Sequence, residues 1–453
     1  MHVAELERKP SRSNAESNKL SADDRAAHDW YRFVLSFPPH LVRDYLERFA
    51  IGPDQQVLDP FCGTGTTLVE CKKLGIPSAG VEANPMAHFA SQVKVSWDVD
   101  PDGLIEHANR VADAAQTEFE SSGVEDLSLP LFSNRRKVAD QLRTLPDESQ
   151  RLLLTDSISP RPLHKTLVLL DCLKAQADER YQRHESLALA KALVGSISNL
   201  HFGPEVGVGQ AKPDAPVLAP WLAGVRTIAE DIRALRRLRK TPASAHQADA
   251  RRLIEVVKPG SIDAVITSPP YPNEKDYTRT TRLESVLLGF IRDKADLRAL
   301  KNGLVRSNTR NVYKADDDDQ WIAANPEIQR IAEAIEARRI ELGKTSGFER
   351  LYARVTKLYF GGMARHLAEL RTTLRPGAQL AYVVGDQASY LRVMIRTGQL
   401  LAELAQSLGY ELIGIDLFRT RLATATREQL REEVVVLRWP GFPATKSANL
   451  LPQ

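Results

Sequence analysis

The pattern of apolar positions alternates between strand-like and helix-like stretches in two regions of the chain. In residues 40–100, "HLVRDYLERFAI" predicts a helix, "QVLDPF" a short strand, "TTLVECKKLG" a helix closed by Gly75, and "SAGVEAN" a second strand. In residues 246–440, "DAVITS" predicts a strand, and "YARVTKLYFGGMARHLAELRTTL" a long amphipathic helix stopped by Arg375, Pro376 and Gly377. Further strands are predicted at "AQLAYVVGD", "YELIGIDLF" and "EEVVVLRW", with a helix at "TGQLLAELAQSLG". This alternation predicts a doubly wound α/β sheet.

The segment between these regions has a different pattern. Residues 101–245 are mostly helical in spacing, and a loop rich in Gly and Pro, "HFGPEVGVGQAKPDAP", interrupts them. A second insertion, 293–348, carries "KADDDDQW" and many other charges, and the polar residues 1–27 are expected to form a mobile tail. We therefore predict one α/β domain built from 28–100 and 246–453, with a mostly helical insertion at 101–245.

Composition narrows the class only slightly. The net charge is +3, from 61 basic and 58 acidic residues, which neither requires nor excludes a nucleic-acid partner. The chain has no apolar run that would cross a bilayer and no apolar signal core near its start. Its cysteines, Cys62, Cys71 and Cys172, are too few and too scattered for a disulfide framework or a zinc cluster. We therefore expect a cytoplasmic protein without a membrane partner or a metal site.

The segment "VLDPFCGTGTTLVE" combines a strand, a turn with Gly63 and Gly65, and a helix start. Glycines in such a turn let the backbone approach a ligand beyond the carboxyl end of the strand. Two phosphate-binding motifs are excluded, because the Lys of a P-loop and the third glycine of a dinucleotide fingerprint are missing. Asp59 would repel an anion and suits a cation or an ammonium group.

The next predicted strand ends at Glu82, where a carboxylate can accept hydrogen bonds from both hydroxyls of a ribose. A glycine turn, a carboxylate placed for ribose hydroxyls and the lack of a phosphate-binding motif together indicate S-adenosylmethionine. Asp249, shortly before the strand "DAVIT", is a candidate partner for the adenine amino group, although a solvated helix-cap Asp is an equal alternative. An exposed Glu beside a purely structural turn is the alternative for the whole pattern.

The stretch "TSPPYPNEKDYTR", 267–279, places two prolines directly after a predicted strand. Proline cannot donate to a strand ladder, so the pair by itself indicates only the end of a strand. The serine before the prolines offers a hydrogen-bond acceptor, and the tyrosine after them offers a flat aromatic face. With the cofactor motif elsewhere in the chain, these two groups indicate a catalytic pocket.

These residues resemble the amino-directed DNA methyltransferases. "DPFCGTGTT" resembles the cofactor motif of that family, "SPPY" its catalytic motif, and "FVLSFPPHLV" at 33–42 the segment that precedes its glycine turn in a prokaryotic branch. The resemblance implies a Rossmann-like methyltransferase fold with a terminal antiparallel strand, and a target recognition domain between the two motifs. It also implies cofactor contacts at Phe37, Pro38, Asp59, Pro60, Phe61, Cys62, Gly63, Thr64, Gly65, Thr66, Thr67, Glu82, Ala83, Asn84 and Asp249.

The family places a methyl group on an exocyclic amine of a base, a weak nucleophile that must be held by both hydrogens. The resemblance implies that Ser268 Oγ and the carbonyl of Pro269 are the two acceptors, that Pro269 and Pro270 fix the backbone, and that Tyr271 stacks on a flipped base. The Ser-Pro-Pro form resembles the cytosine-N4 enzymes of the family more than the adenine-N6 enzymes, which carry Asp-Pro-Pro, so the resemblance favours cytosine N4 over adenine N6. An RNA amino-methyltransferase and a catalytically silent DNA-binding protein are further alternatives.

DNA binding requires a basic surface. The candidates lie directly after the SPPY motif and in "RTIAEDIRALRRLRK": Lys275, Arg279, Arg282, Arg233, Arg236, Arg237 and Arg239. Weaker candidates are "SNRRK" at 133–137, His201, Phe202 and Glu205 in the Gly/Pro loop, and Arg419 and Arg421 near the last strands. The expected partners are DNA and a cognate restriction endonuclease, in a restriction-modification or phage-defence system.

Overall fold

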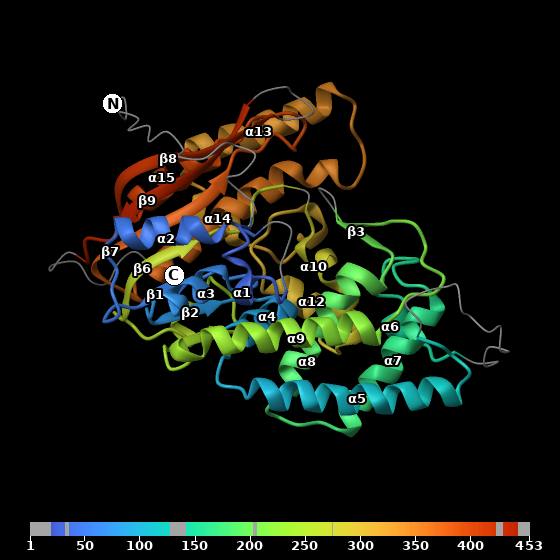
Figure 1. Cartoon of the computed structure of the whole chain (residues 1–453). Helices are drawn as coiled ribbons and strands as arrows, with labels where there is room; N and C mark the ends of the chain where they lie inside the picture. Colours follow the sequence, from blue (N-terminus) through green and yellow to red (C-terminus); the bar gives the residue numbers. More distant parts are fainter. Residues whose placement is uncertain are drawn as a thin grey trace.

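The structure, a computed structural model, describes residues 20–31, 36–126, 142–202, 206–273, 275–422 and 429–442. Its centre is a seven-stranded sheet in the order β5-β2-β1-β6-β7-β9-β8 (Figure 1). The strands are β1 Val57–Asp59, β2 Ser78–Val81, β5 Ala243–His246, β6 Ile262–Thr267, β7 Leu374–Gly385, β8 Glu411–Leu422 and β9 Gln429–Arg438. From β5 to β7 the strands are parallel, and β9 pairs antiparallel with both β7 and β8. The α/β prediction is confirmed, and the antiparallel strand is last in the chain but lies inside the sheet.

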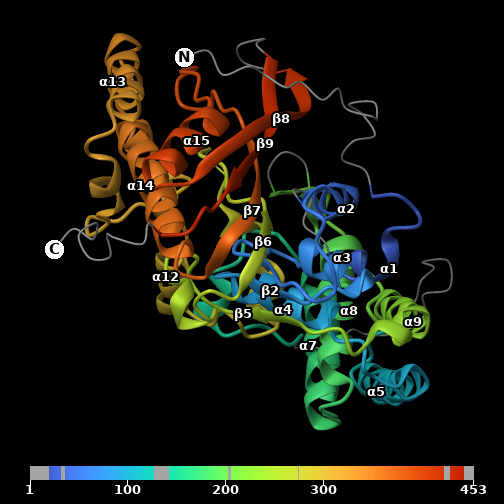
Figure 2. The same cartoon turned by 90° about the vertical axis from the view of Figure 1, so that its left-hand side faces the viewer.

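Helices cover both faces of this sheet. On one face α13 (Pro326–Glu341), α14 (Tyr352–Leu370) and α15 (Thr397–Ser407) pack on a core that includes Leu58 and Val265. On the other face α2 (Pro39–Arg48) packs with Val57 and Ala264, beside α3 (Thr66–Lys73). Figure 2 shows the two helical layers on opposite sides of the sheet. Neighbouring residues of a strand point to opposite faces, so these buried apolar strands need cover on both sides.

Several helices begin where the sequence places a proline. Proline occupies the first turn of α2, α4 (Pro85–Lys94), α5 (Pro101–Ser121), α7 (Pro160–Ala175) and α13. Its fixed φ suits this position, and its missing N–H costs no helical hydrogen bond there. At α4 the side chain of Asn84 also accepts hydrogen bonds from the amides of Met86 and Ala87, so the "EANP" segment both ends a strand region and starts a helix.

The helical segment between the two predicted regions shares a hydrophobic core with the sheet domain. Its main helices are α5, α7, α8 (Gln182–Ala192) and α9 (Leu218–Leu235). Leu187 and Trp221 belong to the same buried cluster as Leu68 of α3 and Met86 of α4. A target recognition role for this segment stays a prediction. The remaining elements are α1 Arg25–His28, α6 Asp147–Gln150, α10 Tyr277–Thr280, α11 Arg282–Leu287, α12 Lys294–Asn302, β3 Leu200–Phe202 and β4 Val206–Val208.

Two expected boundaries differ from the structure. Residues 1–19 lie outside the described residues, but residues 20–27 are not a loose tail, because Asp24 pairs with Arg43 at 2.9 Å and the amide of Ala27 donates to Asp231 at 3.0 Å. The sheet takes up the second region at β5, which begins at Ala243 rather than at the expected residue 246. A four-residue strand with few apolar positions leaves little periodic signal.

The prediction that Arg375, Pro376 and Gly377 stop the preceding helix was wrong, because all three lie in the next strand. Helix α14 ends at Leu370, and β7 already begins at Leu374. The pairing of β7 with β6 shifts register between Ile262 and Ala264, and the partners of these residues are Leu374 and Gln379. Pro376 falls in the skipped part of the ladder, where a strand tolerates a residue without an N–H.

Among the described residues, no helix is long and apolar enough to cross a membrane. The three cysteines are free thiols, and all of them are buried. Their buried positions fit a packing role.

Candidate active site

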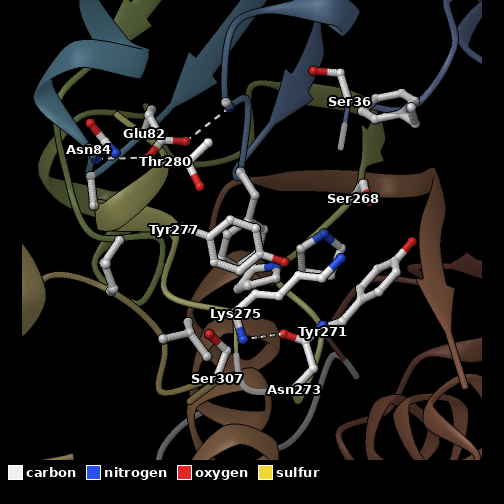
Figure 3. Close-up of a pocket in the computed structure, with 18 of the residues that line it drawn as sticks. Ser36, Glu82, Asn84, Ser268, Tyr271, Asn273, Lys275, Tyr277, Thr280 and Ser307 are labelled. Atoms are coloured by element: carbon white, nitrogen blue, oxygen red, sulfur yellow. Dashed lines mark hydrogen bonds between the residues drawn. The ribbon is translucent and has the colours of Figure 1, made fainter. Parts of the chain in front are cut away.

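A cavity of about 550 Å³ opens beyond the carboxyl ends of the parallel strands. This edge of a doubly wound sheet is where ligands bind, and the volume lies in the range of small-molecule sites. In the view of Figure 3, Glu82 and Asn84 lie on one side of the cavity, Ser268 on the other, and the Tyr277 ring between them. The predicted cofactor residues that line it are Phe37, Pro60, Phe61, Cys62, Gly63, Thr64, Thr66, Glu82, Ala83, Asn84 and Asp249. The glycine turn, the second strand tip and Asp249 therefore meet in one place.

The two glycines of the turn have different roles. Both adopt a left-handed backbone, with φ of 51° at Gly63 and 84° at Gly65. A Cβ on Gly65 would lie 2.9 Å from the Cβ of Ser91, so this glycine permits close packing of α3 on α4. A Cβ on Gly63 would meet nothing within 4 Å, and Gly63 lines the cavity. Gly65 therefore serves packing, while Gly63 keeps the cavity wall free of a side chain.

Asp59 supports the turn from below rather than lining the cavity. It is fully buried and accepts hydrogen bonds from the amide of Phe61 at 3.1 Å and from the hydroxyl of Thr267 at 2.6 Å. Burial raises the pKa of Asp59 to about 6, against the lowering effect of these hydrogen bonds. Its Oδ2 has no hydrogen-bond partner among the described residues. The aspartate thus ties the β1 turn to β6, and its predicted contact with a cofactor stays a prediction.

Three other predicted cofactor residues also stay out of the cavity wall. Thr67 donates its hydroxyl to the carbonyl of Ile266 at 3.1 Å and joins α3 to β6. Pro38 precedes α2 as its N-cap residue, and Gly65 is used in helix packing as described above. These residues shape the site without facing it.

Glu82 connects two parts of the wall. Its Oε2 accepts the amide N–H of Gly63 at 2.9 Å, and its Oε1 accepts the amide N–H of Asn84 at 2.7 Å. Burial raises the pKa of Glu82 to about 7, the two amides lower it, and the charge of Asp59 raises it further. Each carboxylate oxygen keeps a lone pair for a further donor, so the carboxylate holds the glycine turn and can still accept hydrogen bonds from a bound hydroxyl.

Asp249 lies in the cavity wall, and an arginine behind it fixes its carboxylate. The guanidinium of Arg251 contacts both carboxylate oxygens of Asp249, at 2.6 Å for the closest pair. Arg251 also pairs with Asp318 and donates to the carbonyl of Asn302 at 3.0 Å. Both of these partners come from the second insertion, 293–348. The carboxylate of Asp249 therefore has a fixed orientation, and its predicted hydrogen bond to an adenine amino group stays a prediction.

The SPPY motif follows β6 directly and lines the same cavity with Ser268, Pro269, Pro270 and Tyr271. The hydroxyl of Ser268 donates to the carbonyl of Val383 on β7 at 3.1 Å. A hydroxyl has one hydrogen and two lone pairs, so Ser268 can act only as an acceptor toward a ligand while this bond holds.

The Tyr271 ring lies against the ends of β7 and β9. A Cβ on Gly385 would come 3.0 Å from Tyr271 Cε2 and 3.3 Å from Glu432 Cγ, so the glycine makes room for the ring. Burial and the charge of Glu432 raise the pKa of the Tyr271 hydroxyl above its usual range. The phenol therefore stays neutral at physiological pH, and Tyr271 lines the cavity.

The basic residues after the motif divide into two kinds. Lys275 and Arg279 line the cavity, as do Arg419 and Arg421, which both pair with Glu432. The structure does not bring Arg282 to the cavity wall. Its guanidinium donates to the hydroxyl of Thr278 at 2.8 Å and to the carbonyl of Leu152 at 3.3 Å, so it serves to pack α11.

The larger predicted basic cluster lies away from the cavity. Arg236 and Arg239 come just before β5, at the amino edge of the parallel strands, and the backbone carbonyl of Arg239 accepts from Lys72 in the last turn of α3. Arg233 pairs with Asp102 and Arg239 with Asp98. The structure therefore does not place Arg233, Arg236, Arg237 and Arg239 beside the cavity, because the cavity is at the opposite edge of the sheet. The "SNRRK" cluster and Glu205 lie outside the described residues.

Some cavity residues were missed by the sequence predictions. Tyr277 lies six positions after Tyr271 and was inside the quoted motif, so its aromatic type was the available signal. Phe202 had been named without a fixed role and lines the cavity, whereas His201 is exposed on the same strand β3. The wall formed by Gly303, Leu304, Val305, Ser307 and Arg310 of the second insertion had no recognisable sequence signal.

The residues present fit S-adenosylmethionine. Gly63 leaves open space at the turn, and Thr64 lines the cavity with a buried hydroxyl that has no hydrogen-bond partner among the described residues. The cavity also contains carboxylates, Glu82 and Asp249, and aromatic surface from Phe61. This donor and acceptor set suits a nucleoside that carries a positively charged group.

The chain is similar to known DNA methyltransferases. A family model described as DNA methylase (N6_N4_Mtase) matches residues 7–92. The chain is 25% identical over 447 residues to the type II methyltransferase M.BsoBI of Geobacillus stearothermophilus, covering 92% of this chain and 84% of the relative. It is 23% identical over 433 residues to the type II methyltransferase M.AvaI of Nostoc sp., covering 91% and 86%. The similarity to both relatives thus extends across the inserted segment, for which no motif was recognised.

Two further matches are weaker. The type II methyltransferase M.MjaII of Methanocaldococcus jannaschii is 38% identical over 79 residues, which is 17% of this chain and 14% of the relative. The crystal structure of TrmN from Thermus thermophilus is matched with 11% sequence identity and a TM-score of 0.27, covering 88% of this chain and 48% of the other. The family model and the two relatives matched over most of their length thus make the chain similar to amino-directed DNA methyltransferases and support its assignment to that family.

Proposed function

We propose that the protein transfers a methyl group from S-adenosylmethionine to the N4 amine of a cytosine in DNA, at a specific sequence and on a base turned out of the duplex. The observation that carries this proposal is that the glycine turn and Glu82 line the same cavity as Ser268 and Tyr271, although the two motifs are far apart in the chain. The type II methyltransferase names of the full-length relatives support DNA as the substrate and a restriction-modification setting with a cognate endonuclease.

On the cofactor side, the chain supplies a wall that is fixed before binding. Glu82 would accept hydrogen bonds from ribose hydroxyls, and Asp249 from an amino group, both with their orientation already set by backbone amides and by Arg251. When bound, S-adenosylmethionine supplies a methyl group on a positively charged sulfur. Prior orientation of these groups lowers the entropy cost of binding and keeps the reacting centre aligned.

On the base side, two oxygen atoms would hold the amine. Ser268 gives its hydrogen to the carbonyl of Val383, which leaves its lone pairs for one N–H of the base. The carbonyl of Pro269 would accept the other N–H, and the two prolines restrict its direction. Held by both hydrogens, the nitrogen presents its lone pair out of the plane of the ring, toward the methyl donor.

Tyr271 would stack on the flipped base. Extraction of a base costs a few kcal/mol, and stacking on an aromatic ring contributes roughly 1–3 kcal/mol. Lys275 and Arg279 at the cavity wall would contact nearby phosphates. Serine is a neutral and weaker acceptor than aspartate, and this choice favours cytosine N4; adenine N6 is the alternative, and an RNA amine the further one.

The test is methyl transfer from labelled S-adenosylmethionine to unmethylated DNA, followed by mass spectrometry of the nucleosides. N4-methylcytosine is the expected product, and N6-methyladenine would establish the alternative. Label found only in an RNA substrate would refute both DNA proposals. Ser268→Ala is the matched control: it should abolish transfer and leave the affinity for S-adenosylhomocysteine within about twofold, because Ser268 belongs to the base side.

A further inference from the structure

A histidine lies beneath the cofactor side of the cavity. His366, on α14, is fully buried. Its Nδ1 lies 2.8 Å from the carbonyl oxygen of Ala250, and its Nε2 lies 2.7 Å from the hydroxyl of Tyr382. The ring also meets the ring of Phe61 edge to face, with 4.8 Å between centroids. Ala250 and Phe61 both line the cavity, so one imidazole contacts two separate parts of its wall.

The neighbours determine which ring nitrogen carries the hydrogen. A carbonyl oxygen can only accept, so Nδ1 must be the donor toward Ala250. Burial lowers the pKa of His366 to about 4, and the neutral ring then has an acceptor at Nε2, which receives the hydroxyl hydrogen of Tyr382. The imidazole is therefore fixed in one tautomer and one orientation by two opposite hydrogen bonds.

The carbonyl that accepts the hydrogen bond from Nδ1 links the histidine to the site. Ala250 directly follows Asp249 in the loop after β5, and Phe61 lies in the loop after β1. These loops lie on opposite sides of β2 in the sheet order. A plain apolar side chain would fill the same space on α14 without the cost of burying a polar ring. The histidine instead donates a hydrogen bond to the carbonyl of Ala250, next to Asp249, the proposed partner of the adenine.

We propose that His366 is a positioning residue for the cofactor site: its Nδ1–H holds the 248–250 loop, and its ring supports Phe61, at the separation that the nucleoside of the cofactor requires. The proposal rests on the proposed function, since it concerns the same cofactor. If this role is right, loss of the hydrogen bond to Ala250 lowers the cofactor affinity more than loss of the hydrogen bond to Tyr382. An ordinary core residue would affect only the stability of the protein.

Two isosteric variants separate the two nitrogens. His366→Asn keeps an amide N–H where Nδ1 was, and His366→Gln keeps an acceptor where Nε2 was. We expect similar losses of melting temperature in both. S-adenosylhomocysteine affinity, measured by calorimetry, should stay within about threefold in His366→Asn and fall about tenfold or more in His366→Gln. The KM for DNA should stay unchanged in both.

Tyr382→Phe serves as the control, because it removes the other hydrogen bond of the same ring. It should reduce stability and leave the cofactor affinity within about twofold. Equal affinity losses in His366→Asn and His366→Gln, or a loss in Tyr382→Phe as large as in His366→Gln, would overturn the positioning role alone. A wild-type protein that bound no S-adenosylhomocysteine would overturn the proposed cofactor and this proposal with it.

Discussion

The carboxylate of Glu82 predicts two pH dependences of opposite sign. Glu82 lines the cavity proposed for the cofactor, and burial raises its pKa to about 7. A ribose hydroxyl donates its hydrogen bond more strongly to a carboxylate than to a carboxylic acid. We therefore expect the cofactor to bind better as the pH rises through 7, while the folded protein without cofactor becomes less stable over the same range.

The magnitudes follow from the pKa. If only the ionised form binds, the fraction that is competent falls from about nine-tenths at pH 8 to about one-tenth at pH 6, which weakens the affinity about tenfold, or about 1.4 kcal/mol. For stability, the folded pKa of about 7 lies above the ordinary value of 4.5. The proton is held more tightly in the folded state, so this contribution is complete below pH 4.5 and is lost as the pH rises through 7, up to about 3 kcal/mol.

The assay compares wild type with Glu82→Gln at pH 6, 7 and 8. Calorimetry with S-adenosylhomocysteine gives the affinity, and thermal unfolding gives the stability of the protein without cofactor. Titration of the cofactor itself and of Asp59, whose pKa burial raises to about 6, is present in both proteins and largely cancels in the ratio. The wild-type affinity should gain about tenfold relative to the variant between pH 6 and 8, and the stability of the wild type should fall relative to that of the variant over the same range. An equal slope in the two proteins would refute the assignment of Glu82.

Three other substitutions test separate parts of the site. Gly65→Ala should destabilise the protein by about 1–3 kcal/mol in thermal or denaturant unfolding, because its φ is 84° and the new Cβ would clash with α4. Gly63→Ala should instead reduce cofactor affinity with a smaller loss of stability, because its Cβ would meet only open cavity. Tyr271→Ala should weaken DNA binding by about 1–3 kcal/mol, measured by fluorescence anisotropy, with cofactor affinity unchanged; a loss of cofactor affinity would contradict its role. Arg279→Ala should reduce the slope of log affinity for DNA against log salt concentration by about one. Arg236→Ala, at the opposite edge of the sheet, should leave the slope unchanged. Equal effects of the two variants would contradict the proposed location of the DNA surface.

The sheet was largely predictable because its strands carry strong local patterns. The apolar run of "DAVITS" appears as β6 at Ile262–Thr267, and "EEVVVLRW" appears as β9 at Gln429–Arg438, which ends one residue before its Trp439. Strand β5, Ala243–His246, has the sequence "ASAH" and was missed. Its only fully buried position is Ala245, and its place in the sheet depends on pairing with β2. Such a strand is specified by tertiary contacts rather than by its own periodicity.

The site residues that belong to a sequence motif were predictable, whereas those placed by tertiary packing were not. The glycine turn, Glu82 and the SPPY motif all reach the cavity. Charge clusters were poor guides: "RALRRLRK" is strongly basic, yet Arg236 and its neighbours lie at the opposite edge of the sheet. The sequence gives the sign of a charge but not the side of the sheet on which it falls, and only the order of strands and helices decides that.

The second insertion forms part of the wall of the cavity proposed for the cofactor. Its Asp318 lies in a tight 3₁₀ turn against α14, where a Cβ on Gly361 would come within 1.9 Å of the Asp318 carbonyl, so only glycine permits this approach. That contact places Asp318 to pair with Arg251, and Arg251 holds Asp249. The buried charges depend on one another, since removal of one partner leaves an unpaired charge in the interior. Within the acidic run "KADDDDQW", Asp316 pairs with Arg306 and Asp318 with Arg251, and through Asp318 the insertion orients a residue of the proposed cofactor site.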